Sequence, residues 1–159
     1  MKILIVSDTH RQNENFYRVV DLVKPELVVH CGDVEGSEEE LIRAAGCPVY
    51  MVAGNNDFFS DLPKELEVSI AGHRTWITHG HHYYVSMGPE MIREEAMERG
   101  AEIVMYGHTH RPVVYRDANV IAVNPGSLSY PRQEGRKPSY IIMESDRKGE
   151  LHFTIAYLD

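Results

Sequence analysis

Two short segments of the chain each place two potential metal ligands two residues apart, directly after an apolar run. Asp8 and His10 form the first pair, and His108 and His110 form the second. In an extended backbone, side chains two positions apart project to the same side. Each pair could therefore direct two donor atoms toward one point, as a metal-binding site requires.

Three further polar side chains follow predicted buried strands in the same way, namely Asp33, Asn55 and His79. Functional side chains of an open α/β sheet collect at the carboxyl ends of its strands. We therefore expect all seven donors to lie along one edge of the sheet. A single ion does not need seven ligands, whereas two ions that share a bridging carboxylate would use them all.

Each of these residues alone has an ordinary structural explanation. Asp33 follows a glycine, which is typical of a turn or a helix cap, and residues 54–57 (Gly-Asn-Asn-Asp) have the composition of a tight turn. His79 and His108 could be hydrogen-bonded histidines at strand ends. Their joint occurrence, in this order and each after an apolar strand, is poorly explained in this way and favours a metal site.

The first third of the chain alternates predicted strands and helices, over residues 2–6, 16–23, 27–29, 37–45 and 48–53. The short connections favour parallel strands joined by right-handed crossovers. Ser37, followed three residues later by Glu40, indicates a capping box at the start of the second helix. A hairpin, a third helix and a further buried strand are predicted over residues 66–71 with 73–78, 88–99 and 103–106.

The remaining chain shows short strands separated by turn residues, over residues 112–116, 119–123, 138–144 and 150–157. We expect these four strands to form a second, mainly antiparallel sheet. The predicted fold is thus an α/β single domain over residues 1–159: a two-sheet β-sandwich flanked by helices, with αββα layers.

Composition excludes several classes of function. The formal net charge is −8, from 24 acidic and 16 basic residues, which opposes binding to a nucleic-acid polymer or an anionic membrane. No apolar run approaches the roughly 20 residues that a membrane span needs. The two cysteines, Cys31 and Cys47, suit a reducing compartment, and we expect a cytoplasmic protein.

The ordered motifs resemble those of the calcineurin-like metallophosphoesterases. These motifs are Asp-x-His, Gly-Asp, Gly-Asn-x-Asp, His-Gly and Gly-His-x-His, which extend from Met1 to His110, with a further similar loop at Asn124-Pro-Gly-Ser127. The length and the Gly-Asn-Asn-Asp variant resemble the small bacterial and archaeal phosphodiesterases of that superfamily, a group that includes the retromer subunit Vps29.

The resemblance implies a metallophosphoesterase-like fold with two metal positions. Asp33 would bridge the two ions; the first would be held by Asp8, His10 and His110, and the second by Asn55, His79 and His108. Such oxygen and nitrogen donors suit Mn²⁺, which we expect, or Ni²⁺, Co²⁺, Fe²⁺ or Zn²⁺. The implied reaction is hydrolysis of a small phosphodiester by a hydroxide that bridges the two ions.

The sequence departs from the wider family at Asn56. Many members carry histidine there as a general acid, whereas an amide can donate a hydrogen bond but not release a proton at neutral pH. We therefore predict a preference for esters with good leaving groups, such as aryl phosphodiesters. His81 could lie near the substrate or support a ligand, so Asp33, Asn56 and His81 are the candidate catalytic residues. Arg11, Asn124 and Ser127 could border the pocket, and the sequence does not define their roles.

Two alternatives differ in the use of the same fold. One is a protein-interaction scaffold like Vps29, which would have no reason to keep all seven ligand positions filled. The other is a phosphomonoesterase or nucleotidase with the same site, although no residue cluster matches a dianionic terminal phosphate. A homodimer or homotetramer is expected from the resemblance alone.

Overall fold

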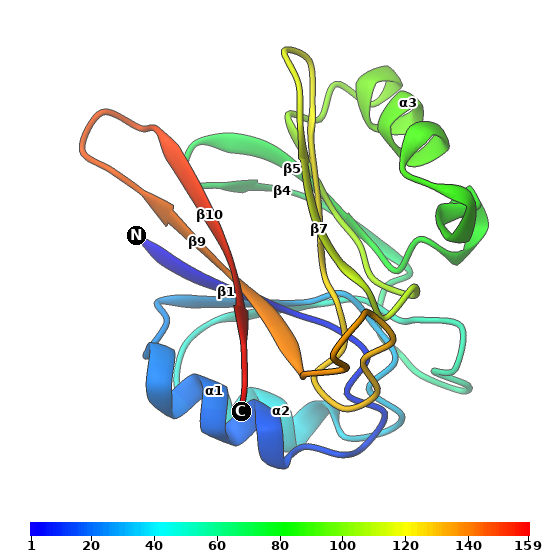
Figure 1. The fold of residues 1–159 in the computed structure, drawn as a ribbon, viewed down its shortest axis with the longest axis vertical. Helices are drawn as coiled ribbons and strands as arrows, with labels where there is room; N and C mark the ends of the chain where they lie inside the picture. The colour runs from blue at the N-terminus through cyan, green and yellow to red at the C-terminus, as the bar shows by residue number, and fades with distance from the viewer.

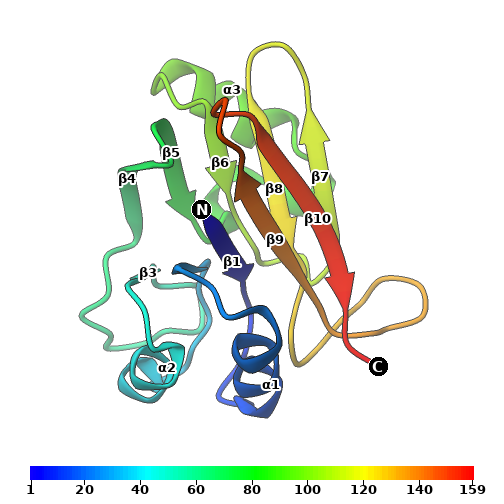
Figure 2. The ribbon, with the colours of Figure 1, turned by 90° about the vertical axis from the view of Figure 1, so that its left-hand side faces the viewer.

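The computed structural model describes residues 1–159, which form two five-stranded sheets packed face to face (Figures 1 and 2). The first sheet has the order β10-β9-β1-β2-β3; its strands, in that order, are Leu151–Tyr157, Ser139–Ser145, Lys2–Val6, Leu27–His30 and Val49–Met51. The second sheet has the order β4-β5-β6-β8-β7; its strands, in that order, are Glu65–Ile70, His73–Thr78, Ile103–Met105, Ile121–Pro125 and Pro112–Arg116.

Helices cover the outer face of each sheet. Two helices, α1 (Glu14–Val23) and α2 (Glu38–Ala45), pack on the first sheet, and α3 (Glu90–Glu98) packs on the second (Figure 1). Two 3₁₀ turns, η1 (His81–Tyr83) and η2 (Val85–Met87), precede α3. The layers therefore follow the predicted αββα order. None of the helices has the length and apolar character needed to cross a membrane.

Strand β1 shows why its sequence is apolar at successive positions. Ile3 and Ile5 belong to the core between the two sheets, and Leu4 and Val6 belong to the core beneath α1 and α2. Because successive side chains of a strand point to opposite faces, a strand covered on both faces needs apolar residues at every position.

The last four strands do not form a sheet of their own, so that part of the prediction is wrong. Strands β7 and β8 extend the second sheet, where β8 pairs in parallel with β6. Strands β9 and β10 extend the first sheet, where β9 pairs antiparallel with β1 through Ile5 and Ile141. Both sheets are therefore mixed, with parallel and antiparallel strand pairs. Hydrophobic alternation identifies a strand but does not specify its distant partner.

The predicted capping box is also absent. The Ser37 side chain makes no cap hydrogen bond to α2 and donates instead to the carbonyl of Val34, at 2.8 Å. The Glu40 carboxylate accepts hydrogen bonds from Asn13 and Tyr17, in and beside α1, both at 3.4 Å. These interactions hold α1 against α2 rather than closing the end of one helix.

Candidate metal centre

The seven predicted donors follow the carboxyl ends of strands from both sheets, rather than one sheet as expected. Strands β1, β2 and β3 are parallel neighbours in the first sheet, and β5 and β6 are parallel neighbours in the second. Their ends meet at one edge of the sandwich, where donors from β1 and β2 approach donors from β5 and β6.

The loops that carry the donors adopt an uncommon backbone conformation. Five of the seven donor residues have positive φ although none is glycine; these are Asp8 (55°), His10 (48°), Asp33 (63°), His108 (74°) and His110 (59°). Such conformations cost roughly 1–3 kcal/mol each and persist only where the surrounding structure enforces them. Their concentration at one edge indicates that the fold holds these side chains in place for function.

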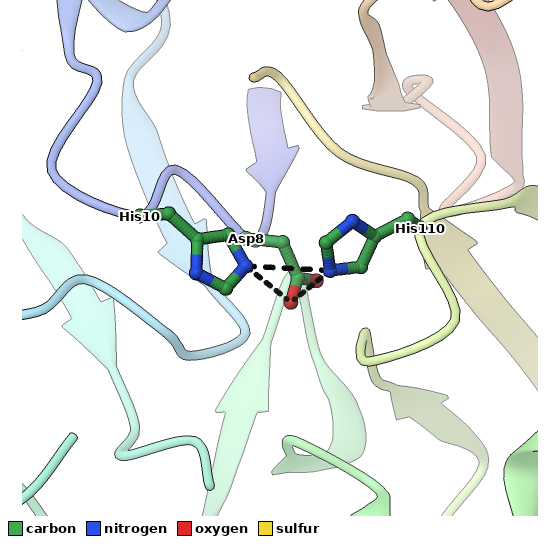
Figure 3. Close-up of side chains that lie close together, drawn as sticks. All are labelled: Asp8, His10 and His110. Carbon is green, nitrogen blue, oxygen red and sulfur yellow. Dashed lines mark hydrogen bonds and ion pairs between the residues drawn. The ribbon is translucent and has the colours of Figure 1, made fainter. Parts of the chain in front are cut away.

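Asp8 lies at the middle of the cluster, and its two carboxylate oxygens have different surroundings. Oδ2 accepts hydrogen bonds from the Ser7 hydroxyl at 2.6 Å and from the His108 amide at 3.1 Å. Oδ1 is buried without a hydrogen-bond partner and lies 3.6 Å from Nε2 of His10 and 3.2 Å from Nε2 of His110 (Figure 3). The protein thus fixes one oxygen and leaves the other facing the imidazoles.

Asp33 and His79 extend the cluster into the second sheet. Nε2 of His79 lies 3.4 Å from Oδ2 of Asp33 and 3.7 Å from Oδ1 of Asp8, and it is also buried without a hydrogen-bond partner. Nε2 of His10 lies 3.7 Å from the same Asp33 oxygen. The donors form two groups whose atoms all lie within 4.8 Å of one another; these are Asp8–His10–His110 and Asp8–Asp33–His79.

Hydrogen bonds to the backbone fix two of the imidazoles. Nδ1 of His79 lies 2.8 Å from the carbonyl of Cys31, and Nδ1 of His110 lies 2.6 Å from the carbonyl of Tyr130. A carbonyl can only accept, so each Nδ1 carries the proton, and in the neutral ring Nε2 keeps its lone pair toward the cluster. Metal-binding histidines are oriented in this way by their second nitrogen.

Opposite charges shift the protonation of the cluster. Burial alone would lower the pKa of His79, but the adjacent carboxylates of Asp8 and Asp33 raise it to about 9. Burial alone would raise the pKa of Asp8, yet the charge of His79 and the nearby imidazoles of His10 and His110 hold it well below its usual range. The metal-free site therefore holds ionised carboxylates together with a protonated His79.

Asn55 and His108 lie beside this cluster in a more exposed position. Nδ1 of His108 is 3.1 Å from Oδ1 of Asn55, and the His108 ring lies 5.2 Å from the ring of His79. The side chain of the next residue, Asn56, points toward Asp33. Its backbone N–H and its amide N–H donate to the two Asp33 oxygens, at 2.9 and 3.0 Å.

His81 also lies close to the cluster, but among imidazoles rather than carboxylates. Its ring is 4.0 Å from that of His82 and 5.5 Å from that of His79. Burial and these neighbouring rings lower the pKa of His81 to about 4, so it is neutral at pH 7. Nε of Arg11 donates to the carbonyl of Glu35 at 2.8 Å, and Arg11 lines an open cavity beside His10.

The 124–127 loop supports the centre through hydrogen bonds to the loops that carry the donor residues. The Ser127 hydroxyl donates to the carbonyl of Asp8 at 2.7 Å. The Asn124 amide donates to the carbonyl of Gly107 at 3.1 Å and to the Thr109 hydroxyl at 2.9 Å. Both side chains are buried, so they position the donor loops rather than line a pocket.

Two supporting residues were not predicted from the sequence. The Asp57 carboxylate accepts four backbone N–H groups, from Asp33, Val34, Glu35 and Gly54 at 2.7–2.9 Å, and so ties the β2 loop to the β3 loop. The buried His30 ring accepts the Gly32 N–H at 3.1 Å and therefore donates to the Thr9 hydroxyl at 3.0 Å. The position of Asp57 in the Gly-Asn-x-Asp motif, and that of His30 just before Cys31-Gly-Asp33, were the signals for these roles.

The burial and chemistry of the site's atoms fit a divalent metal ion. A buried carboxylate oxygen and a buried imidazole nitrogen, Oδ1 of Asp8 and Nε2 of His79, have no hydrogen-bond partner. Buried polar atoms without partners are costly, and a cation that displaces the Nε2 proton of His79 would satisfy both. The remaining donors are oxygen and nitrogen atoms without thiolates, which suits a borderline divalent ion.

Comparison with known proteins identifies the family of this fold and site. A model of the calcineurin-like phosphoesterase superfamily domain matches residues 1–148. The chain belongs to the calcineurin-like phosphoesterase superfamily. Calcineurin-like phosphoesterases use divalent metal ions, in agreement with the candidate ligand groups found here.

Curated relatives and solved structures of calcineurin-like phosphoesterases match most of the chain. The probable metallophosphoesterase YsnB of Bacillus subtilis is 32% identical, with 90% of this chain and 83% of the relative covered. The phosphodiesterase MJ0936 of Methanocaldococcus jannaschii is also 32% identical, with 79% of this chain and 83% of the relative covered. A predicted phosphoesterase from Streptococcus pneumoniae superposes with a TM-score of 0.79 at 26% identity, covering 99% of this chain and 97% of the other.

Solved structures of Vps29 proteins share this fold. A Vps29 mutant from Entamoeba histolytica superposes with a TM-score of 0.79 at 18% identity, covering all of both chains. At that identity the likeness shows the fold alone, in agreement with the predicted αββα arrangement.

Proposed function

We propose that this chain is a phosphodiesterase that depends on two divalent metal ions. Oδ1 of Asp8 carries the proposal, because it is buried, unpartnered and aimed at the Nε2 atoms of His10, His79 and His110, at 3.6, 3.7 and 3.2 Å. The relatives named phosphodiesterases support the same reaction class. A scaffold would have no use for a buried carboxylate oxygen left without a partner.

Asp33 would be the ligand common to both ions, because its Oδ2 lies 3.7 Å from Nε2 of His10 and 3.4 Å from Nε2 of His79. The first ion would add Asp8, His10 and His110, and the second would add Asn55, His79 and His108. We expect Mn²⁺, with Ni²⁺, Co²⁺, Fe²⁺ or Zn²⁺ as alternatives, because every ligand is an oxygen or an imidazole nitrogen. A bound pair of such ions supplies an activated water near neutral pH and offsets the charge of a phosphate.

The remaining groups of the chain orient rather than react. Asn56 holds both oxygens of Asp33, and the carbonyls of Cys31 and Tyr130 fix His79 and His110. None of these groups is an acid that could protonate a departing oxygen. Since the pKa of His81 is lowered to about 4, that imidazole is not a proton donor at pH 7 either. We therefore propose aryl phosphodiesters as better substrates than alkyl ones.

The test is a metal-titrated assay on bis(4-nitrophenyl) phosphate and 4-nitrophenyl phosphate. We expect turnover of the diester with Mn²⁺, loss of turnover on chelation, and a roughly thousandfold loss in Asp33→Ala. Asp146→Ala, which removes an exposed carboxylate far along the chain, is the matched control and should retain activity. Activity that survives Asp33→Ala or chelation would contradict the proposal, and faster turnover of the monoester would assign the site to phosphomonoesters.

A further inference from the structure

Two cavities open beside the candidate metal centre, and they share only His10 and Glu35. The first has a volume of about 780 Å³ and includes Arg11, Asn56 and the exposed side chains of Phe58 and Phe59. The second has a volume of about 470 Å³ and is formed with His110 by the segment from Tyr130 to Arg136. A phosphodiester held at the centre has two ester arms, and each cavity has room for one of them.

The charges of the two cavities are opposite. Five carboxylates and one guanidinium group line the first cavity; the acidic residues are Glu35, Glu38, Glu39, Asp57 and Asp61. Two guanidinium groups, of Arg132 and Arg136, and the single carboxylate of Glu35 line the second. A substrate that is anionic at one end only would therefore bind in one orientation.

The guanidinium groups of Arg132 and Arg136 are available for a ligand. Neither forms an ion pair or donates a hydrogen bond within the chain, whereas the neighbouring Lys137 pairs with Asp159 at 2.8 Å. Both residues are exposed and line the second cavity, and an arginine outside an ion pair is suited to bind a carboxylate or phosphate through paired hydrogen bonds.

The segment that carries these arginines is attached to a predicted metal ligand. The backbone N–H of Arg132 donates to the carbonyl of His110 at 3.0 Å, and Nδ1 of His110 donates to the carbonyl of Tyr130 at 2.6 Å. The Tyr130 ring also packs edge-on against His10, with ring centres 5.3 Å apart. The backbone at Tyr130 and Arg132 is therefore tied to His110, which places this segment beside the centre.

We infer that Arg132 and Arg136 recognise an anionic group on one arm of a small phosphodiester, while the other arm, neutral and apolar, lies against Phe58 and Phe59. This inference rests on the proposed phosphodiesterase function and adds the substrate class. A nucleic-acid polymer does not meet the condition, because its next phosphate on the other side would enter the acidic cavity.

A matched pair of synthetic diesters tests the inference. Both release 4-nitrophenolate; the retained arm is 3-carboxypropyl in one and its neutral isostere 3-carbamoylpropyl in the other. With the Mn²⁺-loaded protein we expect kcat/KM to be about tenfold higher for the carboxylate, and the ratio to shrink as salt is raised. In the double variant Arg132→Gln/Arg136→Gln the ratio should fall to about one, with hydrolysis of the carbamoyl ester reporting that the variant is folded.

Arg147→Gln is the matched control, because it removes the same charge from the exposed β9–β10 turn and should keep the wild-type ratio. A ratio near one in the wild type, or a high ratio that the double variant keeps, would overturn the inference and leave the proposed function intact. Failure to release nitrophenolate from both esters while bis(4-nitrophenyl) phosphate is hydrolysed would overturn the inference alone, and failure with all three substrates would overturn both.

Discussion

Two groups of carboxylates and imidazoles in this protein have similar donors and different surroundings. At the strand ends, Asp8, His10 and His110 are mostly buried, with donor atoms within 4.8 Å of one another. At the β9–β10 turn, Asp146, Glu150 and His152 lie equally close together but are all exposed. Spacing and residue type alone would rank the two groups as equivalent metal sites.

Hydrogen bonding separates them. In the exposed group, Oδ1 of Asp146 accepts the N–H groups of Lys148 and Glu150, at 2.8 and 3.0 Å, and Oδ2 lies 3.1 Å from Nε2 of His152. Both carboxylate oxygens of Asp146 therefore have partners within the turn and need no metal ion. In the buried group, Oδ1 of Asp8 has no hydrogen-bond partner, and neither has Nε2 of the adjacent His79. The candidate centre is thus distinguished by buried ligand atoms that lack a hydrogen-bond partner, and not by the mere presence of ligand-type residues.

The largest expected effect contrasts one carboxylate from each group. Asp8→Asn should lower metal affinity and diesterase activity by roughly a thousandfold, because it removes the charge that faces three imidazoles. Asp146→Asn should change neither. Metal content of the purified variants and kcat/KM on an aryl diester measure the difference, and equal metal loss in both variants would remove the distinction drawn between the groups.

A pair of glycine substitutions sharpens the comparison through steric fit. A Cβ at Gly54 would collide with the side chain of Asp33 and lie 2.6 Å from its backbone nitrogen, whereas one at Gly149 would meet nothing within 4 Å. Gly54→Ala should therefore displace Asp33 and reduce metal affinity by roughly a hundredfold. Gly149→Ala should cost only about 1 kcal/mol of stability for its positive φ. Calorimetric metal titration and denaturant unfolding of both variants provide the check.

Protonation should distinguish the buried group in a third way. The carboxylates of Asp8 and Asp33 outweigh burial and raise the pKa of His79 from 6.5 to about 9, so the metal-free protein carries that proton at neutral pH. A metal ion binds the neutral ring, so affinity should rise by about tenfold per pH unit between pH 7 and 9. The ion pairs of protonated His79 stabilise the metal-free fold fully below pH 6.5 and are lost as the pH rises through about 9.

Mn²⁺ titrations at pH 7, 8 and 9 in buffers of different ionisation enthalpy would measure the released proton. An affinity that does not change with pH over this range would contradict the proposed charge state of His79.

The smallest effect concerns the residues that hold the donor loops. His30→Leu leaves the Gly32 N–H and the Thr9 hydroxyl without their buried partner, which should cost about 1–3 kcal/mol of stability. Metal affinity should fall by roughly tenfold as the Asp8 and Asp33 loops loosen. His152→Leu in the exposed group should leave metal affinity at its wild-type value. His30→Asn, which can still accept the Gly32 N–H, should give an intermediate result in the same titrations.

Local sequence patterns were sufficient to predict much of the fold. Burial of β1 on both faces made residues 2–6 recognisable, and the hairpin of β4 and β5 lies where Gly72 predicted its turn. The partners of the last four strands could not be predicted, because β9 joins β1 across more than a hundred residues and alternation carries no information about such pairing. The same limit explains why one predicted edge is in fact the junction of two sheets.

Within the candidate centre, residue types could be predicted and their conformations could not. The sequence placed Asp8, Asp33 and His79 at strand ends, but it did not show the positive φ values of Asp8 and Asp33 or the hydrogen bonds of the three side chains. Asn56 entered the predictions as a candidate catalytic residue, and the hydrogen bond from its amide to Asp33 could not be read from the sequence. Arg132 and Arg136 follow no pattern that sequence alone would reveal, since a surface arginine and an arginine facing a cavity read alike.

The left-handed backbone of five donor residues has a practical consequence. These conformations oppose folding, while an ion that binds only the folded chain opposes unfolding by mass action. Thermal melting should therefore report on metal occupancy directly. A panel of divalent salts ranked by the rise in Tm would identify the cation that best fits the donor residues before any substrate is known.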